Sequence, residues 1–206
     1  MIRNIIFDLG NVLLCFKPAD YLNHSGYPAS LKNEIIKEIF DAPEWRQIDN
    51  GDLTIGEAID KIESRSSLSR QEISEIFDLR LVILFPIERN IKVLPELKKQ
   101  GFKLYFLSNF PADIFDEVVS GNPFFNLFDG GIISSRVRAS KPDRKFYEIL
   151  IDKYSLDPAE CLFIDDLEPN IKTADELGMK SIWYNDSQDL ISLIEKKLDL
   201  SLTHLK

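Results

Sequence analysis

A carboxylate, a hydroxyl, an ammonium and an acidic pair follow four short apolar runs of this chain. In chain order they are Asp8, Ser108, Lys141 and the pair Asp165-Asp166. Ligands of open α/β sheets bind beyond the carboxyl ends of the strands, so we expect these side chains to meet at one rim. Each residue taken alone is also typical of turns, helix caps or solvated loops, and only the conjunction indicates a reaction.

The chemistry that this set suits is phosphoryl transfer, in which catalysis is mainly positioning and charge neutralisation. Asp8 and a phosphate repel each other, so attack on phosphorus needs a bridging cation, and Mg²⁺ held with Asp166 would supply it. Ser108 and backbone N–H groups after the strands would hydrogen-bond the phosphoryl oxygens, while Lys141 neutralises charge. The expected product of the first step is an aspartyl-phosphate.

The elements that must position these residues follow from hydrophobic patterning. Short apolar runs predict buried parallel strands at Ile5 to Phe7, Leu104 to Leu107, Gly131 to Ile133, Cys161 to Ile164 and Ser181 to Trp183. Helical spacing is found at Glu88 to Lys99, Ala112 to Val119, Asp143 to Tyr154, Pro169 to Leu177 and Ser187 to Leu198. This alternation predicts an α/β fold with a three-layer, Rossmann-like core around a parallel sheet.

The first connection of this core is far longer than a crossover requires, which predicts an insertion. Residues 16–85 contain no clear strand, but Leu31 to Phe40 has helical spacing and two capping boxes begin at Thr54 and Ser69. We therefore expect a catalytic core of residues 1–15 and 86–206 and a small helical cap of residues 16–85. The cap would hinge about two short connections.

Composition excludes several other classes of function. The net charge is -9, with 34 acidic and 25 basic residues and no Lys/Arg-rich run, so nucleic acid is not an expected partner. Apolar runs are too short for a membrane span, and the N-terminus lacks the features of a signal peptide, so we expect a cytoplasmic protein. Cys15 and Cys161 are predicted to be buried free thiols. A small phosphorylated metabolite is the expected partner.

Four ordered motifs resemble those of the haloacid dehalogenase-like hydrolase superfamily. They are the run Ile5 to Leu14, Leu107-Ser108-Asn109, Ser140-Lys141-Pro142-Asp143, and Phe163 to Asp166 with Asn170. The place of the helical insertion is similar to the class I cap of that superfamily. The resemblance covers core and cap together.

The resemblance implies a role for each matching residue. Asp8 is the nucleophile, and the carbonyl of Gly10 and the carboxylate of Asp166 join it on Mg²⁺. Asp165 acts through water or orients Lys141, and Asn170 braces the acidic loop. The predicted catalytic residues are Asp8, Ser108 and Lys141; the substrate-binding residues are Leu9, Gly10, Ser108, Asn109 and Lys141; the metal site comprises Asp8, Gly10, Asp165 and Asp166.

Gly10 departs from the pattern, because phosphatases of this superfamily usually carry a second Asp there as general acid and base. Loss of a general acid typically costs about 10² to 10⁴ in rate, so the chain recruits another donor, uses a good leaving group or is slow. Sugar-phosphate phosphatases that this sequence resembles, including glucose 1-phosphate phosphatases, share the glycine. An anomeric phosphate leaves readily, so a hexose phosphate is the expected substrate.

Substitute donors must come from the cap or from the loop after the first strand. The polar choices are Asp20, His24 and Asp49, with Lys17 as an extra phosphate contact. The surroundings of His24 are also typical of an exposed helix end. Trp45 belongs to a substrate-facing surface of the cap or to its packing.

Other readings of the sequence remain open. A signalling receiver module uses similar groups, but its acidic pair comes first and it has no helical insertion. A metal-independent haloacid dehalogenase and a weakly active or inactive phosphate-binding homologue are the alternatives within the superfamily. A phosphomutase would need the proton donor that Gly10 replaces. Spacing alone does not identify the substrate, the oligomeric state, the substitute donor or the cap residues that set specificity.

Overall fold

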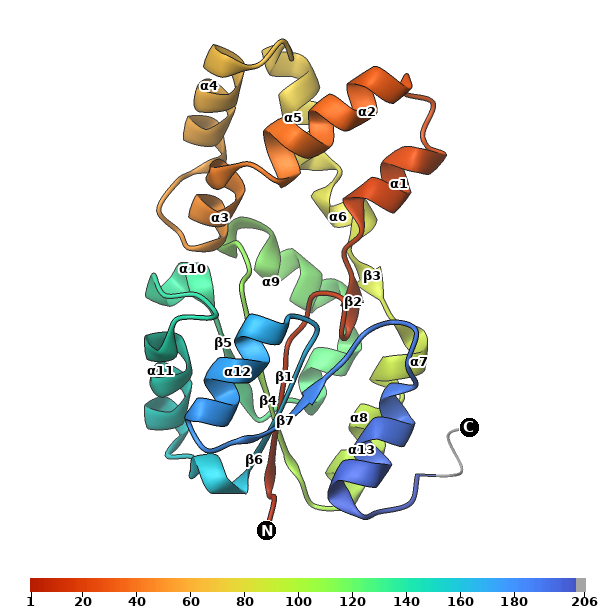
Figure 1. The fold of residues 1–206 in the computed structure, drawn as a ribbon, viewed down its shortest axis with the longest axis vertical. Coiled ribbons are helices and arrows are strands. Elements are labelled where there is room, and N and C mark those ends of the chain that lie inside the picture. The colour runs from red at the N-terminus through yellow and green to blue at the C-terminus, as the bar shows by residue number, and fades with distance from the viewer. Residues whose placement is uncertain (203–206) are drawn as a thin grey trace.

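The computed structural model describes residues 1–202, which form an α/β core below a helical region (Figure 1). The core sheet has the strand order β5-β4-β1-β6-β7, and every pairing in it is parallel. Its strands are β1 (Asn4–Phe7), β4 (Lys103–Ser108), β5 (Gly130–Ile133), β6 (Cys161–Asp165) and β7 (Lys180–Trp183). All five predicted strands are confirmed. Because β1 lies between β4 and β6, their carboxyl ends are neighbours at one edge of the sheet.

Helices cover both faces of this sheet, as its alternating side chains require. Ile5 and Phe7 point to one face and Ile6 to the other. The first face packs against α8 (Val93–Lys99), α9 (Ala112–Gly121) and α13 (Leu190–Leu198). The second packs against α11 (Arg144–Tyr154) and α12 (Glu168–Glu176). The three-layer α/β fold is therefore confirmed.

The core helices differ from their predicted bounds mainly at their starts. The stretch predicted from Glu88 to Lys99 is divided into α7 (Glu88–Ile91) and α8. The last helix, α13, begins at Leu190 because Asp189 caps it by accepting a hydrogen bond from the Ser192 amide. Short elements complete the core: α10 (Ser134–Val137), η2 (Pro123–Leu127) and η3 (Pro158–Glu160).

The inserted helical region has a hydrophobic core of its own. Its helices are α1 (Pro18–His24), α2 (Ala29–Ile35), η1 (Ile36–Phe40), α3 (Pro43–Asp49), α4 (Ile55–Arg65), α5 (Arg70–Asp78) and α6 (Arg80–Ile83). Their apolar faces bury one cluster that draws on residues from Leu22 to Phe77. Both predicted capping boxes are present, at Thr54 with Glu57 and at Ser69 with Glu72. The segment predicted from Leu31 to Phe40 starts earlier and ends in a π-helical turn.

The two connections between core and helical region form a short antiparallel ribbon. The strand β2 (Leu14–Cys15) pairs with β3 (Phe85–Pro86), with Leu14 opposite Pro86 and Cys15 opposite Phe85. Sequence patterning indicated two short connections but missed this pairing, because two-residue strands carry no periodicity. The exact limits of core and cap remain a prediction.

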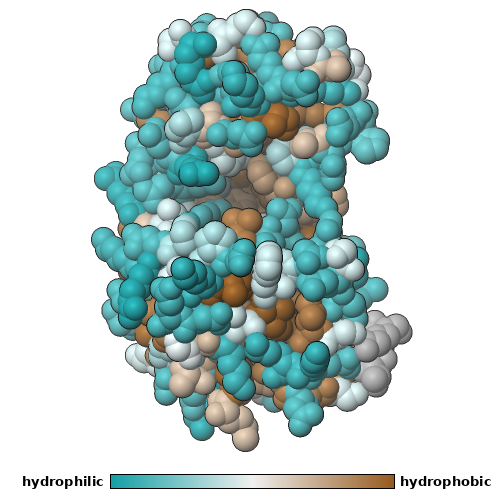
Figure 2. Space-filling model, viewed as in Figure 1, coloured by the Kyte–Doolittle hydropathy of each residue, from teal (hydrophilic) through white to brown (hydrophobic). Residues whose placement is uncertain are grey.

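The surface of the molecule is hollowed between core and helical region, and apolar residues are visible within the hollow (Figure 2). Across residues 1–202, the structure contains no helix with the length and apolar character that a bilayer span needs. Cys161 is a buried free thiol, as predicted, whereas Cys15, at the end of β2, is free but only half-buried.

Candidate active site

Three buried charged residues from separate loops and strands meet at the carboxyl edge of the sheet. Asp8 directly follows β1, Asp165 ends β6, and Lys141 lies in the loop between α10 and α11. The Nζ atom of Lys141 is 2.8 Å from Oδ1 of Asp8 and 2.6 Å from Oδ2 of Asp165. The Asp8 carboxylate, the Lys141 ammonium and the acidic pair therefore lie together, as the strand ends predicted, whereas their catalytic roles stay a prediction.

Asp8, Asp165 and Asp166 form a cluster of hard oxygen donors. Each places one carboxylate oxygen within 4.8 Å of those of the other two. Asp166 is held by a hydrogen bond of 3.3 Å from Nδ2 of Asn11. Carboxylate oxygens in this number are ligands that Mg²⁺ prefers, so the residues present fit that ion. Asp8 and Asp166 are the two that would hold it most directly, since Asp165 is engaged elsewhere.

Asp165 has both carboxylate oxygens engaged in hydrogen bonds. Oδ2 accepts from Lys141, and Oδ1 accepts from Nδ2 of Asn170 at 2.8 Å and from the amide of Leu167 at 2.9 Å. Its side chain is fully buried. Of the two roles that the family resemblance allowed for Asp165, this geometry favours orientation of Lys141. It also places Asn170 where a brace for the acidic loop was predicted.

The remaining predicted substrate-binding residues surround this cluster in different ways. Asn109 accepts from the Lys141 amide at 2.8 Å and donates to the Lys141 carbonyl at 3.0 Å, so it fixes the backbone of the lysine. Gly10 and Ser108 line the cavity above the cluster, as does Asn109. Leu9 is buried, and its amide donates to Oδ1 of Asp8 at 2.7 Å. Leu9 thus contacts Asp8 through its backbone amide.

Burial sets the ionisation of the cluster. It raises the pKa of Asp8 to about 7, against the opposing effect of Lys141 and with reinforcement from the two neighbouring aspartates. Burial and the charge of Asp165 likewise raise the pKa of Asp166. Burial lowers the pKa of Lys141, but the Asp165 and Asp8 carboxylates more than offset it, and the net pKa is raised. A divalent cation would favour the ionised carboxylates that attack and binding require.

A cavity of about 260 Å³ opens above the cluster and extends to the helical region. Its polar floor contains Asp8, Ser108, Lys141 and Asp166, whereas its walls are largely apolar and aromatic. The apolar lining residues are Phe16, Trp45, Leu84, Phe110, Pro111, Ile114 and Leu167.

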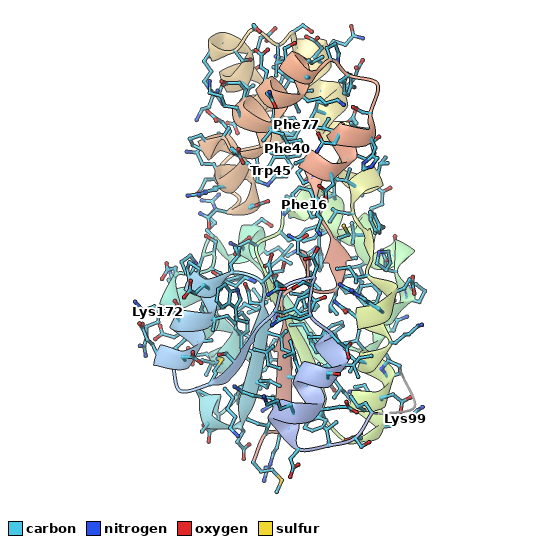
Figure 3. The ribbon with its side chains drawn as sticks, turned by 45° about the vertical axis from the view of Figure 1, so that its right-hand side comes forward. Phe16, Phe40, Trp45, Phe77, Lys99 and Lys172 are labelled. Carbon is cyan, nitrogen blue, oxygen red and sulfur yellow. The ribbon has the colours of Figure 1, made fainter. Side chains whose placement is uncertain are left out.

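Aromatic side chains rise from this cavity into the helical region (Figure 3). Phe16 stacks on Trp45 with ring centroids 5.6 Å apart, and Trp45 lies parallel to Phe77 at 5.8 Å. Phe40 packs against both Phe16 and Trp45. Trp45 therefore packs within the helical region and also lines the cavity, whereas its contact with a substrate stays a prediction.

The candidate substitute donors separate clearly by position. Asp49, the last residue of α3, lines the cavity. Asp20 and His24 are exposed on α1, and His24 ends that helix, as the alternative reading predicted. Lys17 forms an ion pair with Asp186 and is not among the described residues that line the cavity. Asp49 is thus the candidate that the fold brings to the site.

Sequence reasoning missed two polar residues of the cavity, Asn11 and Arg80. Asn11 adopts a φ of 53°, a conformation that Asn tolerates better than most residues, and this places its amide beside Asp166. Arg80 is buried at the start of α6 and donates to Asp113 at 2.8 Å and to the carbonyl of Phe77 at 2.7 Å. A lone arginine in the apolar run from Leu79 to Ile87 was the available signal.

Comparison with known proteins places this chain in a family. The chain belongs to the haloacid dehalogenase-like hydrolases, whose family model matches residues 2–178. It is 30% identical over 182 residues to "Sesquiterpene phosphatase astK" of Aspergillus oryzae, an alignment that covers 88% of this chain and 89% of that protein. It is 24% identical to "Drimenol cyclase drtB" of Aspergillus calidoustus over 92% of this chain but only 35% of that longer protein.

Solved structures with the same fold cover nearly the whole chain. A haloacid dehalogenase family enzyme from Bacteroides thetaiotaomicron, in complex with magnesium and inorganic phosphate, matches with a TM-score of 0.73 and 22% identity over 94% of this chain and 99% of that one. A hydrolase of the same superfamily from Porphyromonas gingivalis matches with a TM-score of 0.74 and 22% identity, over 98% of this chain and 100% of that one. The superfamily assignment from sequence is confirmed, whereas the narrower resemblance to glucose 1-phosphate phosphatases stays a prediction.

Proposed function

We propose that this hydrolase is a Mg²⁺-dependent phosphomonoesterase that forms an aspartyl-phosphate at Asp8. The observation that carries the proposal is the meeting of Asp8, Lys141 and the acidic pair in one buried cluster at the floor of a small cavity. A buried carboxylate beside an ammonium and further carboxylates suits attack on a phosphate whose charge is neutralised on several sides.

Each residue has a distinct task in this proposal. Asp8 attacks phosphorus, while Ser108 and Lys141 hold the phosphoryl oxygens. Asp8, Asp166 and the carbonyl of Gly10 would hold Mg²⁺, which neutralises the charge between the two anionic groups. Asp165 positions Lys141 and completes the acidic cluster. The cap of residues 16–85 closes the cavity over the core.

For the organic part of the substrate, we propose an apolar alcohol in place of the hexose expected from sequence. The cap side of the cavity supplies Phe16, Trp45 and Leu84. Its two ionisable residues in the described lining are Arg80, which is already paired with Asp113, and Asp49. A sugar needs several convergent hydrogen-bonding groups, whereas a hydrocarbon chain needs apolar walls. The name of the Aspergillus oryzae relative, a sesquiterpene phosphatase, agrees with the second case.

The test is a hydrolysis assay with Mg²⁺ on farnesyl monophosphate, glucose 1-phosphate and p-nitrophenyl phosphate. Asp8→Asn should lower turnover of every substrate by more than about 10⁴-fold, as expected for loss of a covalent nucleophile. A chelator should abolish turnover, and added Mg²⁺ should restore it. Asp20→Asn is the matched control, because this aspartate is exposed on α1 and should leave activity unchanged.

The outcomes separate mechanism from substrate. Phosphatase activity that survives Asp8→Asn or chelation would overturn the mechanism. Hydrolysis of 2-chloropropionate in chelator, without phosphatase activity, would favour the metal-independent dehalogenase instead. Higher kcat/KM for glucose 1-phosphate than for farnesyl monophosphate would restore the hexose prediction while leaving the mechanism intact.

A further inference from the structure

The core side of the site leaves one chemical task unassigned. When the bond between phosphorus and the leaving oxygen breaks, an alkoxide leaving group needs a proton. Gly10 has no side chain to supply it, and Lys141 is held between the carboxylates of Asp8 and Asp165. A substitute donor would therefore come from another wall of the cavity.

Asp49 lies in the opposite wall. It stands four residues after Trp45 on α3, so both side chains share one face of that helix, and both line the cavity whose floor holds Asp8. The other charged residue that the cap contributes to the cavity is Arg80, a permanent cation paired with Asp113. Asp49 is thus the cap residue in the described lining that can carry and release a proton.

The end of α3 is fixed against the core, which gives Asp49 a defined place. The hydroxyl of Ser134, on α10, donates to the backbone carbonyl of Asp49. Two residues on, Gly51 approaches so closely that an added Cβ would lie 2.5 Å from the carbonyl oxygen of Ser135. This contact ties the donor-bearing end of α3 directly to the catalytic core.

The surroundings of Asp49 keep its carboxyl group protonated near neutral pH. Burial raises its pKa to about 8, the charge of Arg80 opposes the shift, Asp113 adds to it, and a hydrogen bond from the Trp45 side chain lowers it. The other titratable groups that face this cavity are Asp8, Asp166 and Lys141 on its floor. A carboxylic acid in this state can act as a general acid where an ionised one cannot.

We propose that Asp49 is the catalytic acid that protonates the leaving oxygen. It would take the role of the aspartate that Gly10 replaces. This inference rests on the proposed function. In the first step a carboxylate oxygen of Asp8 bonds to phosphorus and the bond between phosphorus and the leaving oxygen breaks. The electron pair of the broken bond stays on the leaving oxygen, which accepts the proton of Asp49. In the second step Asp49 accepts a proton from water, whose oxygen attacks phosphorus. The bond from phosphorus to Asp8 then breaks, and phosphate, the Asp8 carboxylate and protonated Asp49 result.

Substrates whose leaving groups differ in their need for a proton distinguish a catalytic role of Asp49 from a merely structural one. Nitrophenolate leaves without a proton, whereas the phenolate of phenyl phosphate needs one. Asp49→Asn should therefore lower kcat/KM for phenyl phosphate by about 10² or more, and for p-nitrophenyl phosphate by less than about tenfold. Asp52→Asn is the matched control. Asp52 lies three residues after Asp49, is exposed and is not among the described residues that line the cavity. Equal losses on both substrates, or no loss on either, would overturn the proposal.

Gly10 offers a rescue of the lost function. An added Cβ at Gly10 would meet no heavy atom within 4 Å, so the first atom of a new side chain has open space there. Gly10→Asp introduced into Asp49→Asn should restore phenyl phosphate hydrolysis by at least about tenfold, because a donor returns on the core side. The same substitution should change p-nitrophenyl phosphate hydrolysis far less.

The wild-type enzyme gives a check that does not depend on the folding of any variant. Its kcat/KM for phenyl phosphate should fall as pH rises through about 8, where Asp49 loses its proton, while the value for p-nitrophenyl phosphate should not share that limb. Identical alkaline limbs for the two substrates would overturn the proposal. Failure of the proposed function is distinguishable, because it would appear as activity that survives Asp8→Asn.

Discussion

The cavity has a floor of strand-end residues from the core and a roof of residues from the helical region. The two are built in contrasting ways. On the floor, charged and polar side chains from several strand ends are buried and hydrogen-bonded to one another, as in the chain from Asn170 through Asp165 to Lys141. In the roof, aromatic side chains stack on one another, as Phe16 does on Trp45, and Asp49 lines the cavity four residues after Trp45. The floor suits one fixed reaction, whereas the roof, in the function proposed above, would contact the variable part of a substrate.

This contrast has a physical cause. A buried network of charges is stable only when every member has its partner, so a change in one member disturbs all the others. Apolar packing depends on area and shape and tolerates exchange among residues of similar volume. We therefore expect substitutions in the floor to affect every substrate alike, and substitutions in the roof to change selectivity among substrates.

The strongest test of the contrast outside the catalytic groups is Asn170→Ala. Asn170 donates a hydrogen bond to Asp165, and loss of such an outer partner of a metal-binding cluster typically costs about 10–100-fold in metal affinity or activity. We expect this loss on farnesyl monophosphate and on p-nitrophenyl phosphate in equal measure. Asn122→Ala, which removes a hydrogen bond to Val118 outside the described cavity lining, should leave both activities unchanged. A loss confined to one substrate would break the contrast.

The contact between the end of α3 and α10 can be tested with substitutions at two glycines. Gly51→Ala should lower the free energy of unfolding by about 1–3 kcal/mol, because its φ of 76° and the close Ser135 carbonyl both exclude a Cβ. Gly56→Ala, in the first turn of α4 with open space around it, should raise that free energy by up to about 1 kcal/mol. Urea unfolding measures both. Equal effects of the two substitutions would contradict a close contact between α3 and α10.

The mildest expected effect concerns the aromatic roof. Phe16→Ala should lower kcat/KM for farnesyl monophosphate by about tenfold, as expected for one lost apolar contact, and for ethyl phosphate much less. The exposed aromatic Tyr21 provides the control, since Tyr21→Ala should alter neither value. Equal losses on the long and the short substrate would show that Phe16 supports the reaction itself and would remove the distinction between roof and floor.

Much of the floor could be predicted from sequence, and most of the roof could not. The floor residues follow buried strands, and the apolar runs that predict those strands also predict that Asp8, Ser108 and Asp165 share an edge. The arrangement of the roof depends on how the inserted helices, α3 above all, pack against the core. Nothing in the spacing around Asp49 distinguishes it from Asp20, and only the docking of α3 on α10 brings it over the site. The pairing of β2 with β3 likewise joins residues some 70 positions apart.

The β2–β3 ribbon brings the two ends of the helical region together. Leu14 and Pro86 are paired, and paired Cα atoms in an antiparallel ribbon are only about 5 Å apart. A tight turn of a few residues could therefore join the two strands and bypass every helix from α1 to α6 without shifting one strand of the sheet. If the helical region contacts the substrate as proposed, exchange of what lies beyond that junction would change the choice of substrate and leave the strands of the core sheet in place.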